Sequence, residues 1–195
     1  MQKFLAIFII FITLSACVAF DESTYIVDDN GVSHHTVHYT LDYRGRSNFP
    51  QQIKPTGARL FVFDPKAYAW AAYDKEGRRV MTGAASGGMD YCEDIKKPCR
   101  TVTGDFHMYY KRDKDCFSKA FPVETAGGAK MPYCMYFYRG YSIHAGYQIP
   151  YANSSHGCIK VYPSAAKWLN EVFMQKGTEV VVLSYADENG NDKSD

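Results

Sequence analysis

Short runs rich in β-branched and aromatic residues recur through the middle of the chain, separated by turn signals. Asp74-Lys75-Glu76-Gly77 is a hairpin-type turn between two such runs, and Gly87-Gly88 breaks the regularity after the next. Aromatic residues make up 15% of the chain, which suits pleated, half-buried surfaces. We therefore predict a mainly β domain, with strands at residues 59–64, 68–73, 78–85, 101–110, 131–143 and 178–184.

A single helix is predicted after Pro163, in the C-terminal half of the chain. Ser164 is a reasonable N-cap and Gly177 a good C-terminal stop. The apolar residues at helical spacing are Ala165, Trp168, Leu169, Val172 and Phe173. Such a stripe lets the helix pack on a sheet.

The N-terminus carries an export signal. Residues 1–3 begin with a positive charge, and residues 4–14 form an apolar run interrupted only by Thr13, too short to remain as a membrane span. Leu14-Ser15-Ala16-Cys17 resembles the lipobox of bacterial lipoproteins, in which residues 1–16 would be removed and Cys17 acylated. Ordinary signal cleavage after Ala19 is the alternative. Val18 after the cysteine favours the outer membrane, so we expect a lipid-anchored protein of the periplasm or cell envelope.

The remaining N-terminal segment and the C-terminus look like solvated tails. Residues 17–57 read as a tether with a possible first strand at 35–43, and residues 186–195 as a disordered tail. His34, His35 and His38 lie in the tether, where we expect no metal site. Lys and Arg total 22 against 21 Asp and Glu, so no overall field favours nucleic acid as a partner.

Export changes the interpretation of the cysteines, because an oxidising compartment favours pairing. With Cys17 set aside as a lipid site, Cys92 and Cys99 are close enough in sequence to pair locally. Cys116 and Cys134 are plausible partners across neighbouring strands, although spacing leaves the connectivity open. The leftover cysteine is Cys158.

Cys158 lies in Asn-Ser-Ser-His-Gly-Cys-Ile-Lys-Val, which can support nucleophilic catalysis. A cysteine nucleophile needs a base for its proton and backbone N–H groups for the oxyanion. Gly157 permits a tight turn that lets its amide and that of Cys158 converge. Of the two nearby histidines, His144 is the better base, because it ends a strand and is followed by a loop that could bring Cys158 alongside it. A zinc site from Cys134, His144, His156 and Cys158 fits no usual ligand spacing.

Residues 143–161 closely resemble the signature of the bacterial L,D-transpeptidase catalytic domain of the YkuD type. Arg-Leu-Phe-Val-Phe-Asp, Thr-Val-Thr-Gly-Asp-Phe and the closing Gly-Thr-Glu-Val are similar to other elements of that family. The resemblance implies a β-sandwich with one helix packed on it, over a catalytic domain at residues 58–185. It implies no cofactor and no metal.

The resemblance also implies roles. Cys158 would attack the carbonyl of the third residue of a peptidoglycan stem tetrapeptide and expel the terminal D-alanine. His144 would act as base, with the Ala145 carbonyl holding its orientation, and Gly157 and Cys158 would supply the oxyanion hole. An amine from a second stem would then resolve the thioester, forming crosslinks or protein attachments. Carbapenem-type inhibitors would acylate the thiol. The residues expected to bind or orient the substrate are Tyr147, Tyr151, Ser155, His156 and Lys160.

Three positions depart from the family pattern. Ala145 replaces the usual glycine after the histidine, and Val102 stands where proline is common. Lys160 replaces a frequent arginine, which keeps the charge but loses bidentate carboxylate binding. Two other functions stay open at this point: an L,D-peptidase that uses water as acceptor, and a catalytically silent cell-wall-binding lipoprotein.

Overall fold

The computed structural model describes residues 25–27, 33–35 and 49–185. β1 (Tyr25–Val27) and β2 (Ser33–His35) pair antiparallel as a separate two-stranded sheet. The export signal with Cys17, the rest of the predicted strand at 35–43, His38 and the C-terminal tail lie outside the described residues. In the described part of the chain, no helix is long and apolar enough to cross a membrane.

Residues 49–185 are built on one nine-stranded sheet with the order β6-β11-β3-β4-β5-β10-β9-β8-β7. Most neighbours are antiparallel, and the parallel pairs are β3 with β11 and β9 with β10. The strands are β3 (Leu60–Asp64), β4 (Ala69–Tyr73), β5 (Arg79–Ser86), β6 (Gly104–His107), β7 (Tyr110–Lys111), β8 (Met135–Tyr138), β9 (Tyr141–Ala145), β10 (Ile159–Val161) and β11 (Glu179–Val182).

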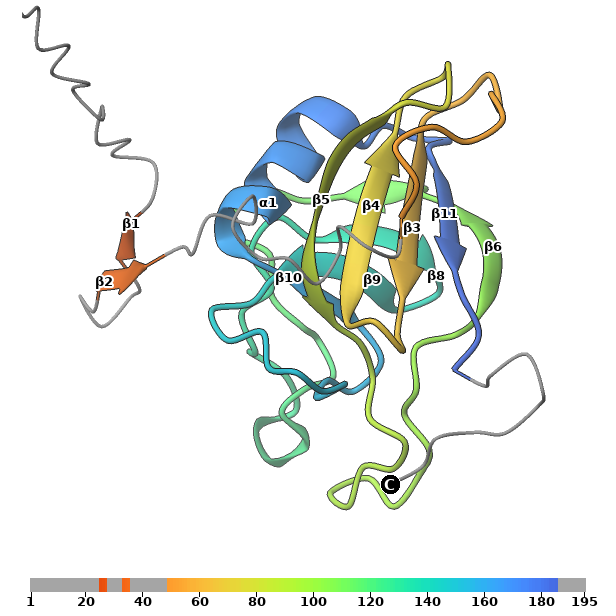
Figure 1. The fold of residues 1–195 in the computed structure, drawn as a ribbon. Coiled ribbons are helices and arrows are strands. Elements are labelled where there is room, and N and C mark those ends of the chain that lie inside the picture. Colours follow the sequence, from red (N-terminus) through yellow and green to blue (C-terminus); the bar gives the residue numbers. More distant parts are fainter. Residues whose placement is uncertain (1–24, 28–32, 36–48, 186–195) are drawn as a thin grey trace, which may run out of the picture.

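The sheet curls until its two ends meet, as Figure 1 shows by the position of β8 and β9 behind β3 and β4. Phe106 on β6 contacts Phe137 and Tyr138 on β8, with ring centroids 5.5 and 5.2 Å apart. The main core fills the space between the two layers. The prediction of a mainly β fold with a helix packed on the sheet is therefore confirmed, although the two layers belong to one continuous sheet.

A second, smaller core lies on the other face of β3 and β4. Phe49 and Ile53 cover Leu60, Val62 and other apolar residues of these strands. Packing therefore extends upstream of residue 58, and β4 is buried along its whole length because both of its faces are covered.

The helix differs from its prediction in two respects. α1 (Pro163–Trp168) begins with proline in its first turn, and its N-cap is Tyr162, so Ser164 is not the cap. The next turn, η4 (Leu169–Phe173), is a π-helix, in which Met174 N–H donates to the Leu169 carbonyl. The wider turn changes the angular phase of the side chains, and Val172 consequently points to solvent.

Two predicted strands are each divided in the structure. Residues 101–110 contain β6 and the start of β7, which pair with different partners. Residues 131–143 contain β8 and part of β9, joined by a tight turn at Arg139 and Gly140. The sequence did not predict this turn, because the run is mostly apolar and aromatic. Arg139 also adopts a positive φ of 45°, a conformation usually found at glycine.

Gly88 lies where three loops meet beside the functional residues. Its N–H donates to Thr101 Oγ1 at 2.9 Å, and it forms an isolated bridge with Ser155. A Cβ atom at this position would stand 1.9 Å from the Cys99 carbonyl oxygen and 2.8 Å from Gly157 Cα. Only glycine permits this close approach.

Gly88→Ala should therefore destabilise the fold by about 1–3 kcal/mol through overpacking against backbone. Thermal unfolding followed by circular dichroism measures the effect. Gly140→Ala is the matched control, because a Cβ there meets nothing within 4 Å. Equal melting temperatures for the two variants would contradict the interpretation.

Candidate active site

The parallel pairing of β9 with β10 brings the key side chains together. Its register places Lys160 beside His144 and Ile159 beside Ile143, so Cys158, just before β10, falls beside Ser142. Side chains alternate along a strand, and residues in register on parallel strands share a face. Ser142, His144, Cys158 and Lys160 therefore lie on one face, as two adjacent rows. The Ser142 hydroxyl donates to Cys158 Sγ at 3.5 Å.

His144 is buried and held in one tautomer. Its Nδ1 lies 2.8 Å from the Ala145 carbonyl oxygen. Because a carbonyl only accepts hydrogen bonds, Nδ1 carries the proton and Nε2 keeps its lone pair. Burial, reinforced by the nearby Lys160 ammonium, lowers the pKa of His144 to about 4, although the Ala145 hydrogen bond opposes this. The imidazole is therefore neutral at neutral pH.

Among the described residues, Cys158 is the cysteine that forms no disulfide. The odd number of cysteines that remains once Cys17 is set aside predicts one such thiol. Cys158 packs against Met131 and the Cys116–Cys134 disulfide. Burial raises the pKa of the Cys158 thiol, while the Ser142 hydrogen bonds and the charge of Lys160 pull it down. The resting pair is thus a neutral thiol and a neutral imidazole, and its proton has to move during attack.

The loop before Cys158 is held by Ser155. The buried Ser155 hydroxyl donates to the Cys158 carbonyl and accepts from Gly157 N–H at 3.1 Å. Gly157 has a φ of 117°, and a Cβ there would stand 2.7 Å from the Tyr141 ring. This differs from the expected oxyanion hole, because the Gly157 amide is already bonded. The Cys158 amide is the remaining candidate donor.

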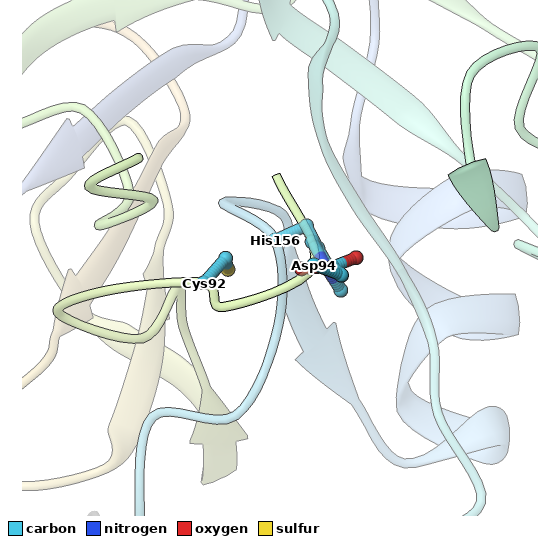
Figure 2. A group of neighbouring side chains, drawn as sticks. All are labelled: Cys92, Asp94 and His156. Carbon is cyan, nitrogen blue, oxygen red and sulfur yellow. The ribbon is translucent and has the colours of Figure 1, made fainter. Parts of the chain in front are cut away.

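His156 is anchored away from the thiol. Its Nε2 lies 2.7 Å from Asp94 Oδ2, and its ring packs on Phe121 with centroids 4.6 Å apart. Figure 2 shows His156 beside Asp94 and Cys92, the three potential metal-ligating groups that lie together in the described residues. Cys92 is bonded to Cys99, so its sulfur cannot serve as a thiolate ligand while the disulfide is intact.

The two disulfides, Cys92–Cys99 and Cys116–Cys134, confirm the expected pairing. Each closes a loop that forms a wall of the site. Asp94, which holds His156, belongs to the first loop, and Phe121 belongs to the second. His156 therefore ties both walls to the segment that carries Cys158.

Lys160 points its ammonium toward the same loop. Its Nζ donates to Ser154 Oγ at 3.0 Å, and that hydroxyl lies 2.9 Å from Ser86 Oγ. Burial lowers the pKa of Lys160, and the nearby Cys158 sulfur opposes this. Lys160 is therefore an electrostatic neighbour of both His144 and Cys158.

His144, Ser155, His156, Cys158 and Lys160 open onto a cleft of about 950 Å³. Tyr147 and Tyr151 do not line it, which contradicts the expectation from the sequence. Tyr151 is 71% exposed and packs edge-to-face on Tyr68 instead. The tyrosines that do line the cleft are Tyr109, Tyr110, Tyr136 and Tyr141.

Sequence reasoning missed these four tyrosines because no local signal marks them. Tyr110 and Tyr136 become neighbours only through the pairing of β7 with β8. Tyr141 starts β9, directly after the turn at Arg139 and Gly140 that divides the predicted strand 131–143.

Residues 58–182 match the family model YkuD, the L,D-transpeptidase catalytic domain. The chain belongs to this family. No curated protein matches the chain. Cys158 and His144, which the resemblance leads us to expect as nucleophile and base, are the thiol and imidazole that β9 and β10 place on one face.

Solved structures share the fold. An L,D-transpeptidase from Xylanimonas cellulosilytica is 27% identical, with a TM-score of 0.59, covering 71% of this chain and 66% of that one. The L,D-transpeptidase LdtMt1 in complex with imipenem is 24% identical, with a TM-score of 0.54 and coverage of 65% and 59%. L,D-transpeptidase 3 from Mycobacterium tuberculosis, with a faropenem-derived adduct, is 20% identical, with a TM-score of 0.53 and coverage of 65% and 60%. The chain thus spans less than two thirds of the length of these proteins.

The pKa of His144 predicts a pH-dependent stability. Unfolding returns the imidazole to its ordinary pKa of 6.5. As the pH falls, the unfolded chain is therefore protonated at His144 near pH 6.5, whereas the folded chain is protonated there only near pH 4. Stability should fall by roughly 3 kcal/mol as the pH drops through this window. Urea unfolding of the wild type and His144→Gln at several pH values measures the difference. Parallel pH curves would contradict the assignment.

Lys160 should control the reactivity of the thiol. Lys160→Met removes a positive charge beside Cys158, so the pKa of the Cys158 thiol should rise. Alkylation of this thiol by iodoacetamide at pH 8 should therefore slow. Peptide mass spectrometry measures the rate at Cys158 against pH. Lys167→Met, on the exposed side of α1, should behave as wild type. A Lys160→Met profile that coincides with wild type would show that the charge has no influence.

Proposed function

We propose that this protein is a peptidoglycan L,D-transpeptidase that works through a thioester on Cys158. The observation that carries the proposal is the placement of Cys158 beside Ser142 and of His144 beside Lys160, at the floor of a large cleft. Membership of the L,D-transpeptidase catalytic domain family supports it.

In the acylation step, Cys158 attacks the carbonyl of the third residue of a stem tetrapeptide. The thiol proton passes to His144 Nε2 as the carbon–sulfur bond forms, because both groups are neutral at rest. The Cys158 amide is the proposed donor to the oxyanion. His144 then gives the proton to the departing nitrogen, the amide bond breaks, and D-alanine leaves.

In the second step, an amine of another stem attacks the thioester and restores the thiol. His144 removes the proton from the incoming amine. The cleft, at about 950 Å³, is at the upper end of the range for small-molecule sites, which supports an acceptor peptide rather than water alone. A silent cell-wall-binding role is disfavoured because Cys158 is a free thiol and the His144 tautomer leaves Nε2 able to accept a proton.

We further propose that the protein is exported and anchored by a lipid on Cys17, with the outer membrane favoured. The two disulfides support an oxidising compartment such as the periplasm. A protonated thiol also resists oxidation better than a thiolate, which suits a nucleophile that works there.

Intact-protein mass spectrometry after carbapenem exposure tests the nucleophile. We expect one adduct on the wild type and none on Cys158→Ala. With a tetrapeptide donor and an amine acceptor, Cys158→Ala should lose all turnover, and His144→Ala should slow it by about 10²–10⁴-fold. Unchanged circular dichroism establishes that both variants fold.

The products separate the alternatives. A crosslinked dimer supports transfer to an amine, whereas tripeptide and D-alanine alone would show an L,D-peptidase. Turnover that survives in purified Cys158→Ala would overturn the proposed chemistry.

A further inference from the structure

The cleft concentrates positive charge in a chain that has almost none overall. Basic and acidic residues nearly cancel across the sequence, at 22 and 21. Among the described residues that line the cleft there is nevertheless no Asp or Glu. The basic residues that line it are Arg112, Lys119, Lys130, Arg139 and Lys160. A ligand that carries carboxylates therefore finds a complementary field there.

Arg112 is one of two arginines that line the cleft. Its backbone N–H donates to the Cys134 carbonyl at 2.9 Å, and its carbonyl accepts from Asn170 Nδ2 at 2.9 Å. The guanidinium stacks 5.3 Å from the centroid of the Phe117 ring. No carboxylate of the described residues forms an ion pair with it.

Arg112 also acts electrostatically on Tyr136, which lines the same cleft. Burial raises the pKa of Tyr136, the Cys158 sulfur raises it further, and Arg112 opposes both. The pKa of Tyr136 therefore responds to both the Cys158 sulfur and this guanidinium.

Arg139 is the second of these arginines, and it precedes a residue that contacts the thiol. The carbonyl of its neighbour Gly140 is 3.9 Å from Cys158 Sγ. Its own carbonyl accepts a hydrogen bond from the Tyr109 hydroxyl, and its guanidinium stacks 5.3 Å from the Tyr138 ring centroid. The φ of Arg139 is 45°, a backbone conformation that glycine adopts more readily than arginine.

Each guanidinium carbon lies over an aromatic ring, 5.3 Å from its centroid, and this contact uses none of the N–H donors on the edge of the group. That edge matches a carboxylate, which can accept two parallel hydrogen bonds. A purely structural role would need only the face-on packing.

We propose that Arg112 and Arg139 form a carboxylate-binding subsite that makes the cleft select peptides with free carboxylates over amidated ones. This inference rests on the proposed function, since a stem tetrapeptide ends in the carboxylate of D-alanine. An internal carboxylate of the stem offers the same chemistry, and the experiment distinguishes the two sources.

Steady-state kinetics with three donor peptides tests the subsite: one with all carboxylates free, one with a C-terminal amide, and one with an internal carboxylate amidated. For the wild type, we expect amidation of the bound carboxylate to lower kcat/KM by roughly tenfold to a hundredfold. In Arg112→Gln and Arg139→Gln, turnover of the free peptide should fall to the level of the amidated one. Lys167→Gln, exposed on α1, should keep the wild-type preference.

Two further measurements separate this proposal from the proposed function. Lys160 lowers the pKa of Cys158 through its charge, whereas Arg112 and Arg139 are not among the groups that shift that pKa. Alkylation of Cys158 by iodoacetamide, a neutral reagent, should therefore be equal in wild type and both arginine variants. Calorimetric binding of the same peptides to Cys158→Ala, alone and combined with each arginine variant, reports the subsite without any turnover.

Equal affinity and equal kcat/KM for all three peptides would overturn the subsite while leaving the thioester chemistry intact. Absence of turnover with every peptide, together with tighter binding of the free peptide that the arginine variants abolish, would retain the subsite and reject the transpeptidase.

Discussion

The short parallel pairing of β9 with β10 is the interaction on which the site depends. It sets Lys160 beside His144 and brings Cys158 beside Ser142. A slip of one residue would turn every side chain of one strand to the opposite face. The register is held from both sides, because β10 also pairs antiparallel with β5, and Gly146 N–H donates to the Val161 carbonyl at 2.8 Å.

Burial then decides the protonation states. It lowers the pKa of His144 and raises that of Cys158, so neither group is charged before substrate arrives. Lys160 opposes the burial effect at the thiol and reinforces it at the imidazole. A thiolate beside Lys160 is therefore favoured by charge, whereas an imidazolium is not. This asymmetry suits a base that holds its proton only briefly before it passes to the leaving group.

The walls of the cleft have a different origin from its floor. The floor is sheet, whereas the walls are loops closed by Cys92–Cys99 and Cys116–Cys134. His156 contacts both loops, through Asp94 of the Cys92–Cys99 loop and Phe121 of the Cys116–Cys134 loop. The histidine next to the nucleophile motif thus has a structural reason for its position that involves no proton transfer.

The sequence by itself determined the fold class and the leftover thiol, and it favoured His144 over His156 as base, which stays a prediction. These follow from local patterns: alternating apolar runs, the odd number of remaining cysteines, and the position of His144 at the end of a strand that a loop joins to Cys158. Local patterns also misled in places. Ser164 has the chemistry of a cap, but Pro163 already begins the helix, and a π-turn moved Val172 to solvent.

Only the tertiary structure decided which residues line the cleft. Tyr147 and Tyr151 are near the motif in sequence but lie outside the cleft, whereas Arg112 and Tyr136 reach it from other strands and loops. The sequence predicts the Gly157 amide as an oxyanion-hole donor, whereas in the structure this amide donates to Ser155 Oγ. The physical reason is common to these cases. Strand pairing and disulfide closure join residues far apart in the chain, and no periodicity within one segment records its partner across the sheet.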